Sequence, residues 1–71
     1  MNDSRIQIRL NGHPRGARRG QTVAELLDEL EVDRRLVVVE VNRQIVRRNE
    51  LQAVTLEPDD QVELVHFVGG G

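Results

Sequence analysis

A dense run of β-forming residues that ends in glycine is the feature of this sequence that most constrains its fold. The run covers residues 61–68, and Gly69, Gly70 and Gly71 follow it. A strand with so few polar residues is typical of the centre of a sheet. Glycine has no side chain and the loosest backbone of any residue, so residues 69–71 are expected to form a flexible tail. The tail offers one distinctive group, the α-carboxylate of Gly71, although a frayed chain end or an engineered linker would have the same composition.

The length of the chain leaves room for one domain. With 71 residues and no cysteine, the protein must fold on one compact core without disulfides or thiolate-bound metal. We expect this single domain over residues 1–68 and the glycine tail over residues 69–71. The first residues carry no apolar stretch of a signal peptide, and no apolar run approaches the ~20 residues that span a bilayer. The sequence therefore predicts a soluble, cytoplasmic protein with no membrane partner.

Charge and aromatic content argue against a nucleic-acid partner. Ten basic and twelve acidic residues give a formal net charge of −2, whereas phosphate binding usually requires a basic excess. Phe67 is the one aromatic residue, so unpaired bases would find no stacking platform. All the basic residues are arginines, and the protein therefore has no side-chain amine on which it could build chains of itself.

The first third of the sequence predicts a strand hairpin. Ile6–Leu10 alternates apolar and polar residues, which is the period of a strand with one buried face. Asn11–Gly12 is a hairpin turn signal. Residues 13–19 include a proline, a glycine and three arginines, with only Ala17 to bury, so they fit a strand at the edge of the sheet.

A helix is predicted from about Val23 to Leu30 or Glu31. Thr22 can cap its first turn, and Glu25, three residues later, completes a reciprocal capping box. Apolar side chains recur on one face at helical spacing, with acidic side chains opposite. The helix should therefore pack on the sheet through one face.

The remaining residues predict further strands, and the order of all elements indicates a fold. The predicted segments are a strand Leu36–Val41, a short strand Ile45–Val46, a short strand or buried loop Val54–Leu56, and a last strand from Gln61 or Val62 to Val68. Residues 47–50 and 57–60 form polar connections. The order predicts an α+β protein with the β-grasp arrangement, a mixed four- to five-stranded sheet packed on one helix. The first and last strands are then parallel neighbours at the sheet centre.

No combination of residues in the sequence predicts catalysis or a bound metal. His13 and His66 are the only histidines, and without cysteine they leave a transition-metal site short of ligands. Ser4 is the only serine and lies close to the chain end, so a nucleophile–base pair has no foundation. We therefore expect no catalytic residues, no metal and no bound cofactor.

A small apolar face is predicted beside the tail. In the last strand Val65 and Phe67 point away from the core, and in the preceding long strand Val38 and Leu36 share that exposed face. An exposed apolar patch next to a reactive terminus suggests a docking surface for a partner. A one-residue shift of either strand would exchange the two faces and remove the patch.

Several stretches together resemble the ubiquitin-like sulfur carriers, and most closely the ThiS family of thiamine biosynthesis. They are Leu10–Gly12, Gly20–Leu27, Val39–Asn42 with Ile45–Val46, and Asp60–Gly71. A terminal pair of glycines after a strand of this length is the most specific element. The sequence departs from the family at Arg47, where proline is frequent, and at Leu51, where tryptophan is frequent. The resemblance implies a ubiquitin-like β-grasp fold.

The resemblance also implies a mechanism and partners. An activating enzyme of the ThiF type would adenylate the Gly71 carboxylate with ATP, and sulfur from a donor protein linked to a cysteine desulfurase would displace AMP. The resulting thiocarboxylate would give its sulfur to a thiazole synthase of the ThiG type. Gly69 and Gly70 would pass through a narrow channel in the partner. The protein would then be a recycled co-substrate and not an enzyme.

Three other functions remain compatible with the sequence. One is a sulfur carrier for molybdopterin or tRNA thiolation, with the same terminal chemistry and another acceptor. A second is a ubiquitin-like modifier joined to other proteins through an isopeptide bond at Gly71. A third is a plain β-grasp binding module whose glycines have no chemical role.

Overall fold

The computed structural model describes residues 4–67. Gly69–Gly71 and the predicted strand end at Val68 lie outside the described residues. The elements in chain order are β1 (Arg5–Leu10), β2 (His13–Arg18), α1 (Val23–Glu29), the 3₁₀ helix η1 (Arg34–Leu36), β3 (Val37–Val41), β4 (Gln44–Val46), the 3₁₀ helix η2 (Arg48–Ala53) and β5 (Gln61–His66).

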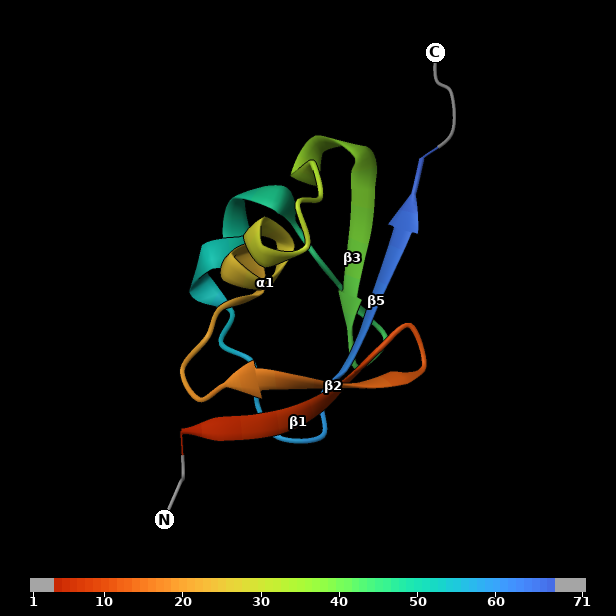
Figure 1. Cartoon of the computed structure of the whole chain (residues 1–71). Coiled ribbons are helices and arrows are strands. Elements are labelled where there is room, and N and C mark those ends of the chain that lie inside the picture. Colours follow the sequence, from red (N-terminus) through yellow and green to blue (C-terminus); the bar gives the residue numbers. More distant parts are fainter. Residues whose placement is uncertain (1–3, 68–71) are drawn as a thin grey trace.

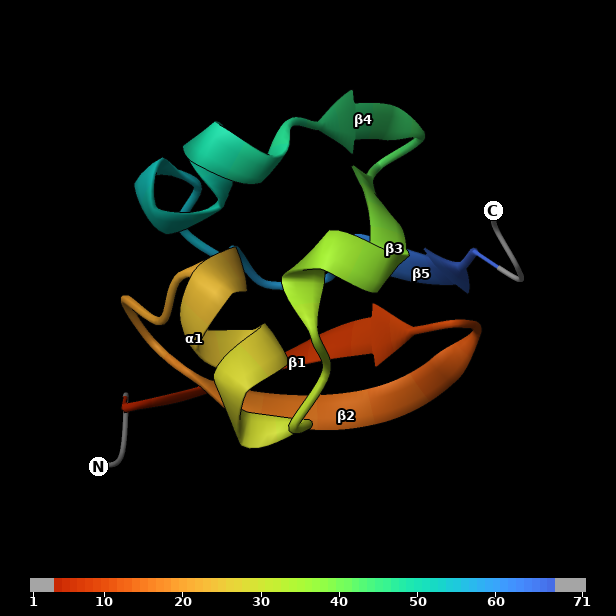
Figure 2. The same ribbon diagram turned by 90° about the horizontal axis from the view of Figure 1, so that it is seen from above.

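The five strands form one mixed sheet in the order β2-β1-β5-β3-β4 (Figure 1). β1 and β5 are parallel neighbours, and the other adjacent pairs are antiparallel. The helix α1 lies against one face of this sheet (Figure 2). This arrangement confirms the predicted α+β, β-grasp fold, with the first and last strands at its centre and β2 at an edge.

The β1–β2 hairpin forms through the predicted turn. Asn11 and Gly12 have φ values of 50° and 83°, and two successive residues with positive φ match the twist of flanking strands. Ile6 pairs with Ala17, which is the one buried residue of β2. The remaining β2 side chains are polar, small or proline, as expected for a strand with one unpaired edge.

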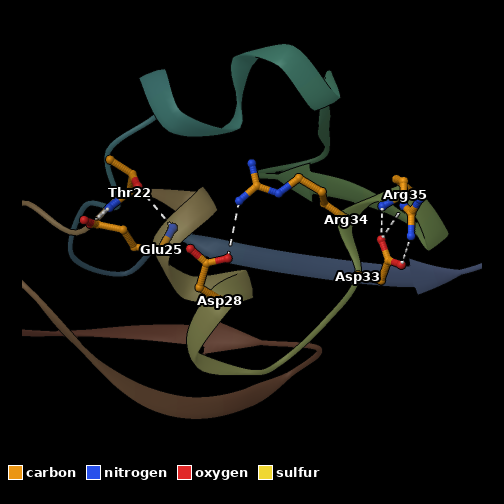
Figure 3. Close-up of polar contacts among 6 residues, drawn as sticks. All are labelled: Thr22, Glu25, Asp28, Asp33, Arg34 and Arg35. Carbon is orange, nitrogen blue, oxygen red and sulfur yellow. Dashed lines mark hydrogen bonds and ion pairs between the residues drawn. The ribbon is translucent and has the colours of Figure 1, made fainter.

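The helix begins at the predicted cap and ends slightly earlier than predicted. Glu25 N donates to Thr22 Oγ1 at 3.1 Å and Thr22 N donates to Glu25 Oε1 at 3.0 Å, which completes the capping box (Figure 3). α1 stops at Glu29, because Glu31 has a φ of 58° and turns the chain out of the helix. Val32 N then donates to Leu27 O and closes the end.

One core joins the helix, the sheet and the long connection before β5. Its most deeply buried aliphatic side chains are Ile8, Val23, Leu26, Leu27, Leu51, Leu56 and Val62. Each side chain of this size stabilises the fold by about 1.5–3 kcal/mol through burial of apolar surface. Within residues 4–67, none of the helices has the length and apolar character needed to cross a membrane.

Two predicted segments differ in the structure because short 3₁₀ helices carry little sequence signal. Leu36 ends η1, so β3 begins at Val37 and not at Leu36. The polar connection after β4 contains η2, which buries Leu51 at 1% exposure. The predicted last strand also ends earlier, at His66. Residues 54–56 form no regular strand: Thr55 makes an isolated bridge with Thr22, and Leu56 is the buried residue of the three.

Candidate functional site

The predicted site begins where β5 leaves the sheet. β5 lies between β1 and β3, and Val62 near its start is completely buried. Central placement of a strand with β-branched and aliphatic residues keeps it fixed relative to the core. The residues predicted to react and to thread into a partner, Gly71, Gly70 and Gly69, follow β5 and are not among the described residues.

Two asparagines fasten β5 to the turns on either side of it. Leu64 N donates to Asn11 Oδ1 at 2.8 Å, and Gln61 N donates to Asn42 Oδ1 at 3.0 Å. Both asparagines have positive φ values, 50° and 52°, a conformation that asparagine adopts more readily than most residues. Neither contact across the sheet was predicted from the sequence, where Asn11 was interpreted only as a turn residue.

A buried carboxylate organises the turn before β5. Asp60 is 9% exposed, and its oxygens accept hydrogen bonds from Asn42 Nδ2 at 2.9 Å and from Glu57 N at 2.8 Å. The Asp60 carbonyl accepts from Arg9 N at 2.9 Å, so the same residue joins β5 to β1. A buried carboxylate is costly unless it is hydrogen-bonded, and here both oxygens have donors. Asp60 thereby fixes the point at which β5 enters the sheet.

The four predicted docking residues lie at one end of the sheet. Val38 pairs directly with Val65, and Phe67 N donates to Leu36 O at 2.9 Å. Val65 and Phe67 are each 54% exposed and Leu36 is 51% exposed, whereas Val38 is half-buried. We call these four residues the apolar end patch. The observed register excludes the one-residue shift that would have turned Val65 inward, and the docking role itself stays a prediction.

Leu36 reaches the apolar end patch from a helix and not from a strand. Asp33 accepts from Arg35 N at 2.9 Å and pairs with the Arg35 guanidinium at the same distance, while Arg34 pairs with Asp28 at 3.4 Å (Figure 3). The hydrogen-bonded Arg35 guanidinium lowers the pKa of Asp33 to about 2. These contacts hold η1, and therefore Leu36, beside the end of β5.

One exposed apolar residue was not predicted. Ile45 of β4 is 67% exposed and pairs with Glu40, which alternates with the core residue Val39. Ile45 therefore lies on the outer face, like Val65, but the directly paired carboxylates Glu40 and Glu63 intervene. The alternation of three residues in β4 was too short to assign its faces from sequence.

Metal ligands do not gather anywhere in the described part of the chain. Between residues 4 and 67, no group of three or more histidine, cysteine, aspartate or glutamate side chains could hold a metal. His13 of β2 and His66 of β5 are both exposed. The apolar end patch and the residues that follow it remain the candidate site.

Comparison with models of protein families shows to which family this chain is related. The model of the ThiS family matches residues 8–71, which is nearly the whole chain. The chain belongs to the ThiS family. The stretches that carry the resemblance include Asn11 and Asn42, and in the structure Asn42 holds the first residue of β5 and Asn11 holds its middle, at Leu64.

Two ThiS relatives and one thiazole synthase show the extent of the similarity. The chain is 46% identical over 66 residues to a thiazole synthase of Magnetococcus marinus, covering 93% of this chain but only 20% of that protein. It is 38% identical over 50 residues to the sulfur carrier protein ThiS of Bacillus subtilis, covering 70% of this chain and 76% of that protein. It is 32% identical over 66 residues to ThiS of Escherichia coli, covering 93% of this chain and 100% of that protein.

A solved ThiS-family structure shows the same fold. The crystal structure of the thiamine biosynthesis protein ThiS from Geobacter metallireducens superposes with a TM-score of 0.80 at 33% identity. The superposition covers 93% of this chain and 100% of that protein. The ThiS-type β-grasp fold is therefore common to both.

Proposed function

We propose that this protein is a sulfur carrier of thiamine biosynthesis and acts as a co-substrate of other enzymes. The observation that carries the proposal is the ThiS-family match over residues 8–71, which includes Gly69–Gly71 as well as the β-grasp domain. The sulfur carriers of Bacillus subtilis and Escherichia coli, at 38% and 32% identity, support the same function.

The proposed reaction takes place at the carboxylate of Gly71. A carboxylate oxygen attacks the α-phosphorus of ATP, pyrophosphate leaves, and an acyl-adenylate forms on an activating enzyme of the ThiF type. Hydrosulfide, released from the persulfide of a desulfurase-linked donor protein by a thiol reductant that is oxidised to a disulfide, then attacks the carbonyl carbon. The new C–S bond forms as the C–O bond to AMP breaks, AMP leaves with the electron pair, and a proton is released to water. The product is a terminal thiocarboxylate.

A thiazole synthase of the ThiG type is the proposed acceptor of the sulfur. The relatives from Magnetococcus marinus and Paramagnetospirillum magneticum are named thiazole synthases, and each contains a region similar to 93% of this chain within one larger polypeptide. A carrier and an acceptor that share one polypeptide are held at high effective concentration. We propose that the same two parts meet here as separate proteins.

The apolar end patch is the proposed docking surface for these partners. Gly71 lies four positions after Phe67 along the chain, and a fully extended chain spans at most about 14 Å over four Cα–Cα steps. A partner that binds the patch must therefore have its reactive pocket within about 14 Å of Phe67. Glycine at positions 69 and 70 would allow a narrow channel to admit the chain, because neither residue has a side chain.

Intact mass measurement tests the proposal. Incubation with the activating enzyme, ATP and a sulfide source should raise the mass by the difference between one sulfur and one oxygen atom, about 16 Da. The thiocarboxylated protein should then support thiazole formation by the synthase. Deletion of Gly70 and Gly71 should abolish both results. A mass that stays unchanged in the wild-type protein would contradict the proposal, and an adduct heavier by a whole protein would indicate a modifier instead.

A matched pair of variants tests the docking role. Phe67→Asp places a charge in the apolar end patch, and Ile45→Asp places the same charge on the same face outside the patch. We expect Phe67→Asp to slow thiocarboxylate formation at least tenfold and Ile45→Asp to change it less than twofold. Equal rates for the two variants would refute the docking role and leave the carrier function untouched.

A further inference from the structure

The two edges of β5 are paired to very different extents. Toward β3 the register runs without a gap from Val41↔Val62 to Val37↔His66. Toward β1 it covers only Arg9↔Gln61 and Leu10↔Val62. β1 ends at Leu10 because the chain turns back into β2. The carboxyl-terminal half of β5 therefore has β3 beside it, and no other strand within residues 4–67 lies on its other side (Figure 1).

The hydrogen bonds show which backbone groups of β5 point to which neighbour. Gln61 O accepts from Asn42 N at 2.8 Å and Phe67 N donates to Leu36 O at 2.9 Å, both on the β3 side. Antiparallel strands alternate between hydrogen-bonded and non-bonded residue pairs. The backbone N–H and C=O groups of the odd-numbered residues of β5 therefore point toward β3, and those of the even-numbered residues point toward β1. Val62 O, which accepts from Asn11 N at 2.9 Å, follows this rule.

Three backbone groups at the end of β5 are therefore open. After Leu64 N, which donates to Asn11 Oδ1, the next groups on the β1 side are Leu64 C=O, His66 N–H and His66 C=O. Among residues 4–67 none of these three groups has a hydrogen-bond partner. His66 is exposed, so an incoming chain can reach them.

The outer strand β2 is protected against pairing with another chain and the half-edge of β5 is not. β2 carries Pro14, Arg15 and Arg18, residues that discourage such pairing. Residues 64–67 contain neither proline nor an acidic or arginine side chain. The open half-edge of β5 thus lacks the features that block strand addition elsewhere in the sheet.

We propose that an extended segment of the activating enzyme adds as a strand to this half-edge of β5, beside Leu64–His66. The inference deepens the proposed function and rests on it. Strand addition supplies directional main-chain hydrogen bonds, and alternate side chains of the added strand supply specificity. Its outward side chains would lie next to Val65 and Phe67, so we expect apolar residues there. Pairing at His66 would also orient the chain that follows it toward the adenylation site.

Proline at position 66 tests the proposal directly. His66→Pro removes the open N–H but breaks no hydrogen bond within residues 4–67, because His66 and Val37 form a non-bonded pair. His66→Ala is the matched control, since it removes the side chain and keeps the N–H. With the activating enzyme as the binding partner, we expect His66→Pro to bind about tenfold more weakly, which corresponds to about 1.4 kcal/mol, and His66→Ala to bind within twofold of wild type. Equal affinities of the two variants would overturn the proposal.

Amide hydrogen exchange on the wild-type protein provides a measurement that needs no variant. In the free protein the His66 amide should exchange much faster than the Phe67 amide, which donates to Leu36 O. Binding of the activating enzyme should slow exchange at His66 at least tenfold. Unchanged exchange at His66 in a complex that still forms would overturn the proposal. A wild-type protein that neither binds the enzyme nor is adenylated would instead overturn the carrier function.

Discussion

The Asn11 side chain should account for a measurable part of the stability of β5. Its Oδ1 accepts from Leu64 N at 2.8 Å across 53 positions of sequence, and its backbone has a φ of 50°. Asn11→Ala removes the acceptor and places alanine in the left-handed region. The hydrogen bond and the fixed positive φ exist only in the folded protein, so both changes raise the free energy of the folded state and not that of the unfolded chain.

The expected loss can be worked out from these two effects. The hydrogen bond lies at an exposed position, so water can replace the lost acceptor and the net loss is about 1 kcal/mol. The left-handed backbone costs alanine roughly 1 kcal/mol more than asparagine. The free energy of unfolding should therefore fall by about 2 kcal/mol, which for a chain of this size lowers the melting temperature by roughly 8–16 °C.

Two further substitutions at the same position separate the effects. Asn11→Gly loses the hydrogen bond without backbone strain and should be destabilised by about 1 kcal/mol. Asn11→Asp keeps both an acceptor oxygen and tolerance of positive φ, and it should stay within about 0.5 kcal/mol of wild type. Urea unfolding followed by circular dichroism measures all three, and amide exchange at Leu64 reports the local loss. If Asn11→Ala is no less stable than Asn11→Asp, the role assigned to this side chain is wrong.

Two other predictions concern the elements around the site. Because the Arg35 guanidinium lowers the pKa of Asp33 from 3.8 to about 2, this carboxylate stabilises the fold above pH ~4, and the contribution is lost as the pH falls toward 2. The urea midpoint of wild type should exceed that of Asp33→Asn at pH 5, and the difference should shrink as the pH falls through about 2. A difference that does not change with pH would contradict the assignment. Leu51→Ala removes a side chain that is 1% exposed and should cost about 2–5 kcal/mol, whereas Leu36→Ala at 51% exposure should cost no more than ~0.5 kcal/mol in the same assay. Similar losses for the two leucine variants would show that η2 does not anchor the core.

The sequence was sufficient to predict the elements whose structure depends only on residues close together in the chain. The Asn11–Gly12 turn needs only two residues that tolerate positive φ, and the Thr22–Glu25 capping box needs only their spacing of three. Alternation along β5 also placed Val65 and Phe67 on the outer face, because side chains of a strand change face at every residue. The order of these elements was enough to predict the β-grasp fold and the parallel β1–β5 pair.

Contacts between distant residues were decided only by the folded chain. The sequence predicted Asp60 only as part of a polar connection. In the structure it is buried, and it accepts hydrogen bonds from Asn42, 18 positions away, and from Glu57. Leu36 was predicted to be the first residue of a strand, but it is the last residue of η1, which Asp33 caps. A propensity or a period describes a residue and its neighbours, whereas these placements depend on which surfaces meet after folding.

The sequence by itself determined which strand precedes the glycines, that this strand is central, and which of its side chains face outward. The tertiary structure decided that Asn42 binds the start of the strand and Asn11 its middle, and that one of its edges is open after Leu64. The physical reason is that alternation is a property of a single strand. The partners of its backbone groups depend instead on where the neighbouring strand β1 stops, and the fold ends β1 at Leu10.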